Sequence, residues 1–241
     1  MPIGSLSWVD IPEAHLAFSE AGDGTPLVCV HGWPFHKAKW AKVAERMKGT
    51  CRVPMPGLVD ARATDCHPDA RFDMNAQSST LLAFADDLGL ERFALMKYDR
   101  GGVFHDTARL DETFERRFVR SRMDDLGVLR GQLRYLRGVD WAVVDGLAEV
   151  RPRIAAPTLF LWGREHRIVP VEEGRKLPAS FGRPAQFEEI LSSCLLPYHE
   201  RPEPFAARPL AFLEAPDRTP RKPPPTRTSR AVTRSGARRS D

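Results

Sequence analysis

The chain alternates short, almost wholly apolar runs with longer stretches in which apolar residues recur at helical spacing. The apolar runs predict strands at 15–19, 26–30, 52–54, 93–96, 118–120, 158–162 and 186–191. The helically spaced stretches predict helices at 37–47, 76–88, 101–110, 126–150, 172–179 and 204–213. Gly89 is suited to end the second of these helices. Strands that alternate with helices favour the α/β class, with a mostly parallel sheet covered by helices on both faces.

The composition fits a soluble globular domain. The chain has 241 residues, of which 42% are hydrophobic and 28% charged, enough to form a sizeable core. No apolar run approaches the roughly 20 residues of a membrane-spanning helix, and the first ten residues lack the pattern of a secretion signal. The four cysteines have no metal-ligand spacing, which favours free thiols in a reducing compartment. We therefore expect a cytoplasmic protein with no membrane partner, no metal and no other cofactor.

Charge divides the chain into two parts. Residues 216–241 carry eight basic and two acidic side chains, a net charge of +6, and because the whole chain is at +4, residues 1–215 are at −2. We expect one domain at 1–215, with a reduced cap region at 121–152, and a disordered basic tail at 216–241 that has few large apolar side chains. The slightly negative charge of residues 1–215 predicts that the domain does not bind nucleic acid. The tail either makes weak contacts with anionic partners or is a solvated extension without a role.

Residues 93–110, FALMKYDRGGVFHDTARL, carry the clearest chemical signal. An apolar run ends at Met96, and Asp99, Arg100 and two glycines follow before a helically spaced stretch. This order predicts a sharp turn between a strand and a helix, which lifts a nucleophilic side chain above the end of the strand. The Asp99 carboxylate can attack an electrophilic carbon and form an ester, and the N–H of Arg100 can stabilise the negative charge that develops.

The segment HGWP, residues 31–34, directly follows another buried apolar run. The loop after an early strand supplies a second N–H to this kind of site, and Trp33 stands where that donor is expected. We expect His31 to hold the loop together by hydrogen bonds, with a direct role at the substrate as the alternative.

Four segments, taken in order, resemble α/β-hydrolases of the haloacetate dehalogenase and epoxide hydrolase group. They are HGWP at 31–34, YDRGG at 98–102, PTLFLWGREHRIVP at 157–170 and HERPEPFAARPLAFL at 199–213, and MPGLVDA at 55–61 also fits. The resemblance runs over residues 12–213 and implies an α/β-hydrolase fold and a small-molecule substrate, a haloacid or an epoxide. In this family an aspartate displaces halide or opens the epoxide, a histidine activates water to hydrolyse the resulting ester, and an acid orients that histidine. The resemblance therefore implies Asp99 as the nucleophile.

The chain departs from the family pattern at the general base. The position of the family's catalytic histidine holds Leu195, which can neither accept a proton nor hydrogen-bond a water. His199 and His166 are the candidate substitutes. His199 also fits a solvated or capping histidine at the start of the last helix.

The orienting acid is also displaced, because its position holds His166. Glu165 is one residue away and is expected to point elsewhere. Some relatives place the acid after the preceding strand, where Asp124 or Asp125 could serve, and the alternative is that both are solvated carboxylates.

The turn around the nucleophile differs from the family pattern as well. Lys97 stands where the family has a small residue, and Tyr98 where it often has histidine. The lysine could splay the turn, or it could lower the pKa of Asp99 by Coulomb attraction. Val103 replaces a second arginine that grips the substrate carboxylate in haloacetate dehalogenases, which leaves Arg100 for that role.

The cap region is shorter than the helical cap of the family, which leaves the expected site more open to water. Trp141 and Tyr135 lie in this region. Their N–H and O–H groups could line a halide or substrate pocket, and ordinary packing on the core is the alternative.

Three functions are compatible with these residues: an active hydrolase that uses Asp99, a homologue that keeps the fold without turnover, and a binding protein that acts through residues 216–241. A general base contributes about 10²–10⁴-fold, so its absence at Leu195 should slow ester hydrolysis by roughly that factor. The third alternative predicts salt-sensitive association with anionic polymers, which disappears when residues 216–241 are removed.

Overall fold

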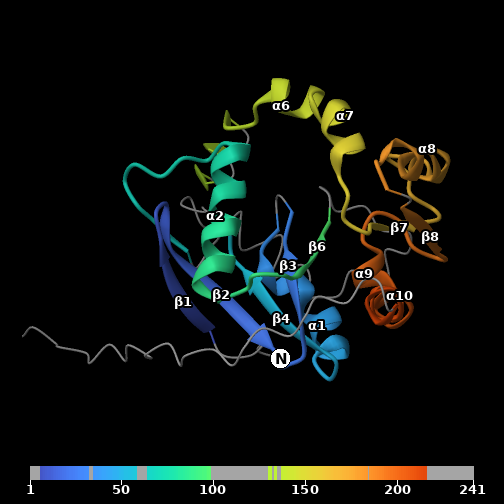
Figure 1. Ribbon diagram of the computed structural model, residues 1–241, viewed down its shortest axis with the longest axis horizontal. Coiled ribbons are helices and arrows are strands. Elements are labelled where there is room, and N and C mark those ends of the chain that lie inside the picture. Colours follow the sequence, from blue (N-terminus) through green and yellow to red (C-terminus); the bar gives the residue numbers. More distant parts are fainter. Residues whose placement is uncertain are drawn as a thin grey trace, which may run out of the picture.

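The computed structural model of the chain describes residues 6–32, 35–58, 64–98, 130–131, 133–134, 137–183 and 185–215. Its strands are β1 (Leu6–Ile11), β2 (Ala14–Ala21), β3 (Thr25–Val30), β4 (Cys51–Pro56), β5 (Asp65–Cys66), β6 (Ala94–Lys97), β7 (Leu159–Gly163) and β8 (Gln186–Ile190) (Figure 1). Its α-helices are α1 (Ala41–Met47), α2 (Met74–Asp87), α6 (Trp141–Asp145), α7 (Leu147–Val150), α8 (Val171–Lys176), α9 (Pro197–Glu200) and α10 (Pro202–Glu214). Short 3-10 helices are η1 (Lys37–Trp40), η4 (Arg151–Arg153) and η5 (Leu177–Ser180).

The larger sheet has the strand order β1-β2-β4-β3-β6, with β5 paired to β2, and β7 and β8 form a second, parallel pair. The strand β3 runs parallel to both of its neighbours. Leu27 of β3 pairs with Ala94 of β6, and Val30 pairs with Lys97, so the two strands end level with each other. The segments that follow Val30 and Lys97 therefore begin at the same edge of the sheet.

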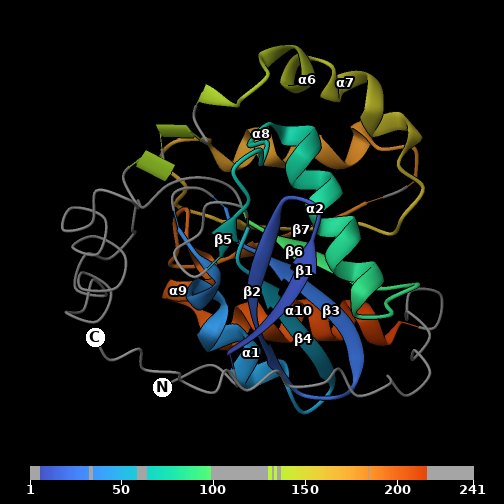
Figure 2. The ribbon, with the colours of Figure 1, turned by 90° about the vertical axis from the view of Figure 1, so that its left-hand side faces the viewer.

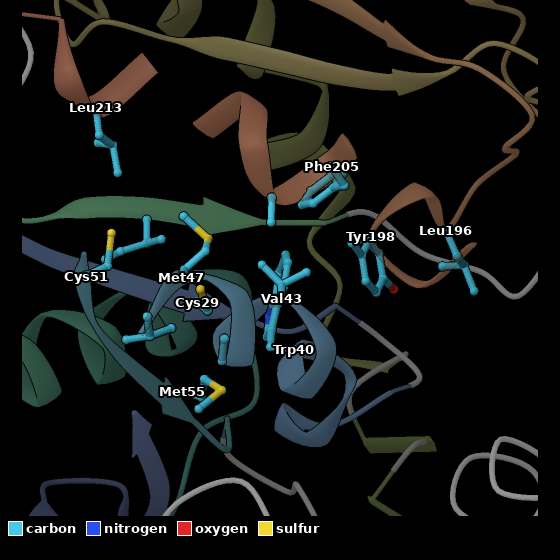
Figure 3. Packing of buried hydrophobic residues seen from close by; sticks show 14 of the residues in the cluster. Cys29, Trp40, Val43, Met47, Cys51, Met55, Leu196, Tyr198, Phe205 and Leu213 are labelled. Atoms are coloured by element: carbon cyan, nitrogen blue, oxygen red, sulfur yellow. The ribbon is translucent and has the colours of Figure 1, made fainter. Parts of the chain in front are cut away.

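Helices cover both faces of the larger sheet, as Figures 1 and 2 show. Side chains of β3 alternate between the two faces: Leu27 and Cys29 belong to a core cluster with α1, α9 and α10, whereas Val28 belongs to a cluster with α2 and the β1–β2 hairpin. Figure 3 shows the first cluster, in which side chains from β3, β4, α1, α9 and α10 meet. Burial on both faces explains why this strand is a continuous apolar run in the sequence.

The predicted α/β arrangement, with helices on both faces of the sheet, is confirmed. Expected elements that fall within the described residues appear close to their predicted bounds, with one exception given below. The expected helix at 37–47 begins as the 3-10 helix η1 before α1 continues it. Gly89 follows α2 with a φ of 64°, the left-handed conformation in which glycine ends helices without strain. The expected elements at 101–110 and 118–120 lie outside the described residues.

Several elements differ from the sequence-based expectation, and the short elements β5, η4 and α9 were not expected. The strand β1 was not expected, yet its residues alternate between exposed and buried because it forms an antiparallel hairpin with β2 that turns one face outward. The single long helix expected at 126–150 is wrong, because the described part of this stretch is broken near Gly138 and Gly146. A new helix, α6, starts where the Asp140 carboxylate accepts a hydrogen bond from the N–H of Ala142 at 2.9 Å.

Among the described residues, no helix is long and apolar enough to cross a bilayer. All four cysteines are free thiols, as expected.

Candidate active site

The edge where β3 and β6 end together carries both segments that the sequence analysis singled out. His31 and Gly32 follow β3, and Tyr98 follows β6. Of the side chains at this edge, Lys97 is exposed, whereas Tyr98 is half-buried and packs against the core. The expected nucleophile Asp99, with Arg100 and Trp33, lies outside the described residues, and so do Val103, Asp124, Asp125 and Tyr135.

His31 joins the loop after β3 to the chain after β4. It is buried, and its Nε2 accepts a hydrogen bond from the N–H of Leu58 at 3.1 Å. Burial lowers the pKa of His31 to about 3, and the nearby charges of His36 and Lys37 contribute in the same direction. The ring is therefore neutral near pH 7, and its nitrogen stays available as an acceptor. This contact fits the loop-holding role expected for His31.

We expect His31 to make the protein sensitive to mild acid. Its pKa is about 3 when folded and 6.5 in the unfolded reference, so between these values the unfolded chain binds a proton that the folded chain does not. Stability contributed by the neutral ring is present above about pH 6.5 and is lost as the pH falls toward 3. From about pH 7.5 to about pH 5, this histidine should lower the free energy of unfolding by about 2 kcal/mol.

Urea unfolding at both pH values measures this loss. The variant His31→Gln keeps a hydrogen-bond acceptor but does not titrate. Its free energy of unfolding should therefore fall by about 2 kcal/mol less than that of the unmodified chain between these pH values. The exposed His67 serves as control, because His67→Gln should keep the full dependence. An unchanged pH dependence in His31→Gln would contradict the assignment.

An aromatic cluster holds the chain where β6 ends. The Tyr98 ring centroid lies 4.7 Å from that of Tyr198 and 5.3 Å from that of Trp40, and the Trp40 and Tyr198 centroids are 5.1 Å apart. Burial raises the pKa of Tyr198 well above its usual value, and Tyr98 raises it further, so the hydroxyl stays protonated. These contacts anchor η1 and α9 to the residue that immediately precedes Asp99.

Lys39 is a residue at this edge that the sequence analysis missed. Its side chain is only 2% exposed, and its ammonium lies 4.3 Å from the centroid of the Phe35 ring. Phe35 also contacts Tyr98, with 6.3 Å between ring centroids, so the end of the Lys39 side chain is buried near the start of the turn. The sequence KAKW suggests solvated lysines, and no local signal in it indicates burial.

The loop after β8 carries Leu195 and is held by two carboxylates. Glu165 Oε2 accepts a hydrogen bond from the N–H of Ser193 at 2.9 Å, and Oε2 of the fully buried Glu200 accepts one from the N–H of Cys194 at 2.8 Å. Leu195 itself packs against the core. The Glu165 carboxylate thus reaches this loop, where it holds the backbone of Ser193.

Gly163, at the end of β7, lets this loop approach the strand. A Cβ atom on Gly163 would lie 1.9 Å from the carbonyl oxygen of Cys194, too close for any other residue without a shift of the backbone. The glycine therefore brings the loop that holds Leu195 and the turn that holds Glu165 next to each other.

The two candidate bases lie in different settings. His166 stacks on Trp162 with 5.2 Å between ring centroids, and its Nδ1 accepts a hydrogen bond from the N–H of Val169 at 2.9 Å. His199 is buried on α9, next to the Tyr198 that packs on Tyr98. The alternative of a solvated His199 is thus wrong, and His199 is the histidine whose helix is packed against the end of β6.

Trp141 does not pack on the core. It is the first residue of α6, and its side chain is 63% exposed. The expectation of ordinary core packing for Trp141 is therefore wrong. Its burial in a pocket is not seen either.

No model of a known protein family matches the sequence. Solved structures do match its fold. An α/β-hydrolase fold protein from Burkholderia ambifaria is similar with a TM-score of 0.67 and 17% identity, over 86% of this chain and 100% of that one. A serine hydrolase involved in carbazole degradation has a TM-score of 0.69 and 19% identity over 87% and 98%. A putative epoxide hydrolase from Pseudomonas aeruginosa has a TM-score of 0.63 and 17% identity over 88% and 96%. At these identities the likeness shows a shared fold.

Proposed function

We propose that this chain, which has the α/β-hydrolase fold, is a hydrolase-like protein whose Asp99 forms an ester with a small haloacid or epoxide. The observation that carries the proposal is the register of β3 and β6, which end level at Val30 and Lys97. The segments that begin HGWP and YDRGG therefore leave the sheet at one edge. Parallel strands present their carboxyl ends at this edge, where α/β folds carry their sites.

In the first step a carboxylate oxygen of Asp99 attacks the carbon that bears the halogen. The new C–O bond forms as the carbon–halogen bond breaks, and the halide leaves with the bonding electrons. With an epoxide, the ring C–O bond breaks instead, and its oxygen takes a proton from water. The Arg100 side chain is suited to bind the carboxylate of a haloacid.

In the second step a water must attack the ester carbonyl, and a base must take its proton. The N–H groups of Trp33 and Arg100 are the expected donors to the oxyanion. Leu195 cannot act as the base. We favour His199 over His166 as its substitute, because α9 packs against Tyr98, whereas Nδ1 of His166 is engaged within its own turn. We therefore expect slow hydrolysis of the ester.

One observation favours a second candidate, a homologue without turnover. Leu195 packs against the core, and the backbone of its loop is fixed by Glu165 and Glu200, so the loop is ordered around an apolar side chain. This arrangement is compatible with a protein that binds an electrophile or its ester and does not release product.

Mass spectrometry of the intact protein and its peptides, after incubation with chloroacetate, fluoroacetate or a simple epoxide, tests the proposal. The expected result is an adduct on the peptide that contains Asp99, absent in Asp99→Ala and retained in the control Asp69→Ala, which alters an exposed aspartate. Free product without an adduct would indicate complete turnover, and its loss in His199→Ala would assign the base. Neither adduct nor product, from protein with a folded circular dichroism spectrum, would contradict the proposal for these substrates.

A further inference from the structure

The short helices α6 and α7 form an arch at one end of the molecule in Figure 1 and Figure 2, and η4 continues the chain from α7. None of their residues is buried. At the C-terminal end of the arch, the N–H of Gly182 donates a hydrogen bond to the carbonyl oxygen of Arg151 at 3.3 Å. Before the arch, the guanidinium of Arg134 lies over the Phe72 ring, 5.5 Å from its centroid. Isolated helices this short are marginal in water, so a surface that covers them would stabilise them.

Large apolar side chains of the arch face solvent. Trp141 is 63% exposed, and Leu147 and Val150 are exposed with it. Leu133, in the helical turn before the arch, is exposed as well. Tryptophan prefers the boundary between water and the hydrocarbon of a bilayer, because its ring is apolar and its N–H is polar.

Positive charge lies on either side of α6 and α7, whereas these two helices themselves carry Asp145 and Glu149 and no basic residue. Arg130, Arg134 and Arg137 are exposed and spaced by four and three residues, so they share one helical face. Over the described residues of 130–153 there are five arginines and three acids, within a domain whose net charge is −2. One of the three acids, Asp140, caps the N-terminus of α6. The described residues of 130–153 are called the cap face below.

We propose that the cap face docks on an anionic lipid surface, with Trp141 at the boundary of the acyl chains and the arginines on lipid phosphates. Exposed apolar groups together with arginines are what such a surface recognises. Two copies of the cap face would oppose like charges, and a nucleic acid would leave the apolar side chains in water. The proposal goes beyond the esterification at Asp99. It also replaces the sequence-based expectation of no membrane partner, and it needs no spanning helix.

Sedimentation of the full-length chain with vesicles of phosphatidylcholine, with and without phosphatidylserine, tests the docking. We expect binding only where phosphatidylserine is present. Trp141→Ala should lower the partition coefficient about tenfold. Trp8→Ala, which removes a tryptophan on β1 that is 47% exposed, should leave it unchanged. Equal binding of the two variants, or no binding by the unmodified chain, would overturn the proposal.

The basic tail needs its own control, because a charge of +6 at 216–241 attracts anionic lipid by itself. A full-length variant with the eight basic residues of 216–241 replaced by glutamine keeps the cap face intact. We expect this variant to bind phosphatidylserine vesicles. Adding Trp141→Ala to it should lower its partition coefficient about tenfold. Loss of all binding in the glutamine variant would overturn the proposal and assign the attraction to the tail. Binding of soluble heparin with the same dependence on Trp141 would also overturn it, in favour of a polyanion partner.

Discussion

Replacing Leu195 by histidine is expected to accelerate hydrolysis of the Asp99 ester by about 10²–10⁴-fold, the usual contribution of a general base. The imidazole can take the proton from the attacking water, which leucine cannot do. The measurement is the decay of the adduct after excess substrate is removed, followed by intact mass. This variant tests whether the base is the missing part of the site.

The structure gives a reason to expect that a histidine at position 195 would be well placed. The loop backbone on the N-terminal side of Leu195 is fixed by hydrogen bonds from Ser193 to Glu165 and from Cys194 to Glu200, and neither involves the side chain at position 195. The Glu165 carboxylate already lies at this loop and can favour the imidazolium that forms during proton transfer. A new base would therefore enter a loop that is already ordered.

Leu191→His is the matched control, because Leu191 lies in the same loop and is 55% exposed. A histidine there should leave the decay of the adduct unchanged. If Leu195→His forms the adduct normally but releases it no faster than the unmodified chain, position 195 is not the place of the base. His199→Ala would then show whether His199 already performs the step.

Replacing Trp40 by alanine is expected to lower the free energy of unfolding by about 3–5 kcal/mol, the usual cost of removing a fully buried aromatic side chain. The loss combines transfer of the indole to water with the cavity that remains between the Tyr98 and Tyr198 rings. Urea unfolding at neutral pH measures it. The same variant should slow adduct formation at Asp99, because Trp40 supports the residue just before it.

Trp141→Ala is the control for this substitution. Its side chain is exposed, so the free energy of unfolding should change by less than about 0.5 kcal/mol. Trp40→Phe keeps an aromatic ring, so its loss in the free energy of unfolding should lie between those of Trp40→Ala and Trp141→Ala. A loss in Trp40→Ala no larger than in Trp141→Ala would show that the aromatic cluster does not hold the edge of the sheet.

The sequence predicted the elements whose own residues determine them. The apolar run before HGWP became β3, because a strand buried on both faces leaves a continuous apolar signal. The run before YDRGG became β6, which is apolar in sequence although Leu95 is 49% exposed. The hairpin strand β1 was missed because its sequence, LSWVDI, has apolar residues on both faces, with Leu6 and Trp8 on the exposed one, so the alternation of burial does not show in the sequence. The long helix expected at 126–150 failed because Gly138 and Gly146 interrupt it and Asp140 starts a new helix, and glycine after a helix and aspartate before one are ordinary signals for these boundaries.

The surroundings of the site could not be predicted in the same way. Trp40, Tyr98 and Tyr198 are far apart in the sequence, and only the fold brings them together. Lys39 lies between an alanine and a tryptophan in a segment that reads as a polar helix start, so its burial depends on packing from other elements. Glu165 has the sequence position of a solvated carboxylate, and its bond to Ser193 depends on how closely the strand approaches the loop.

The way Glu165 and Glu200 hold their loop has a consequence for how such a protein changes over generations. The shape of the loop depends on carboxylates at positions 165 and 200 and on the absence of a side chain at Gly163. A substitution at position 195 therefore leaves these loop contacts in place, and its effect on folding comes from the packing of the side chain against the core. Selection for the shape of the loop does not by itself protect the base, and a single codon change is enough to remove it or to bring it back.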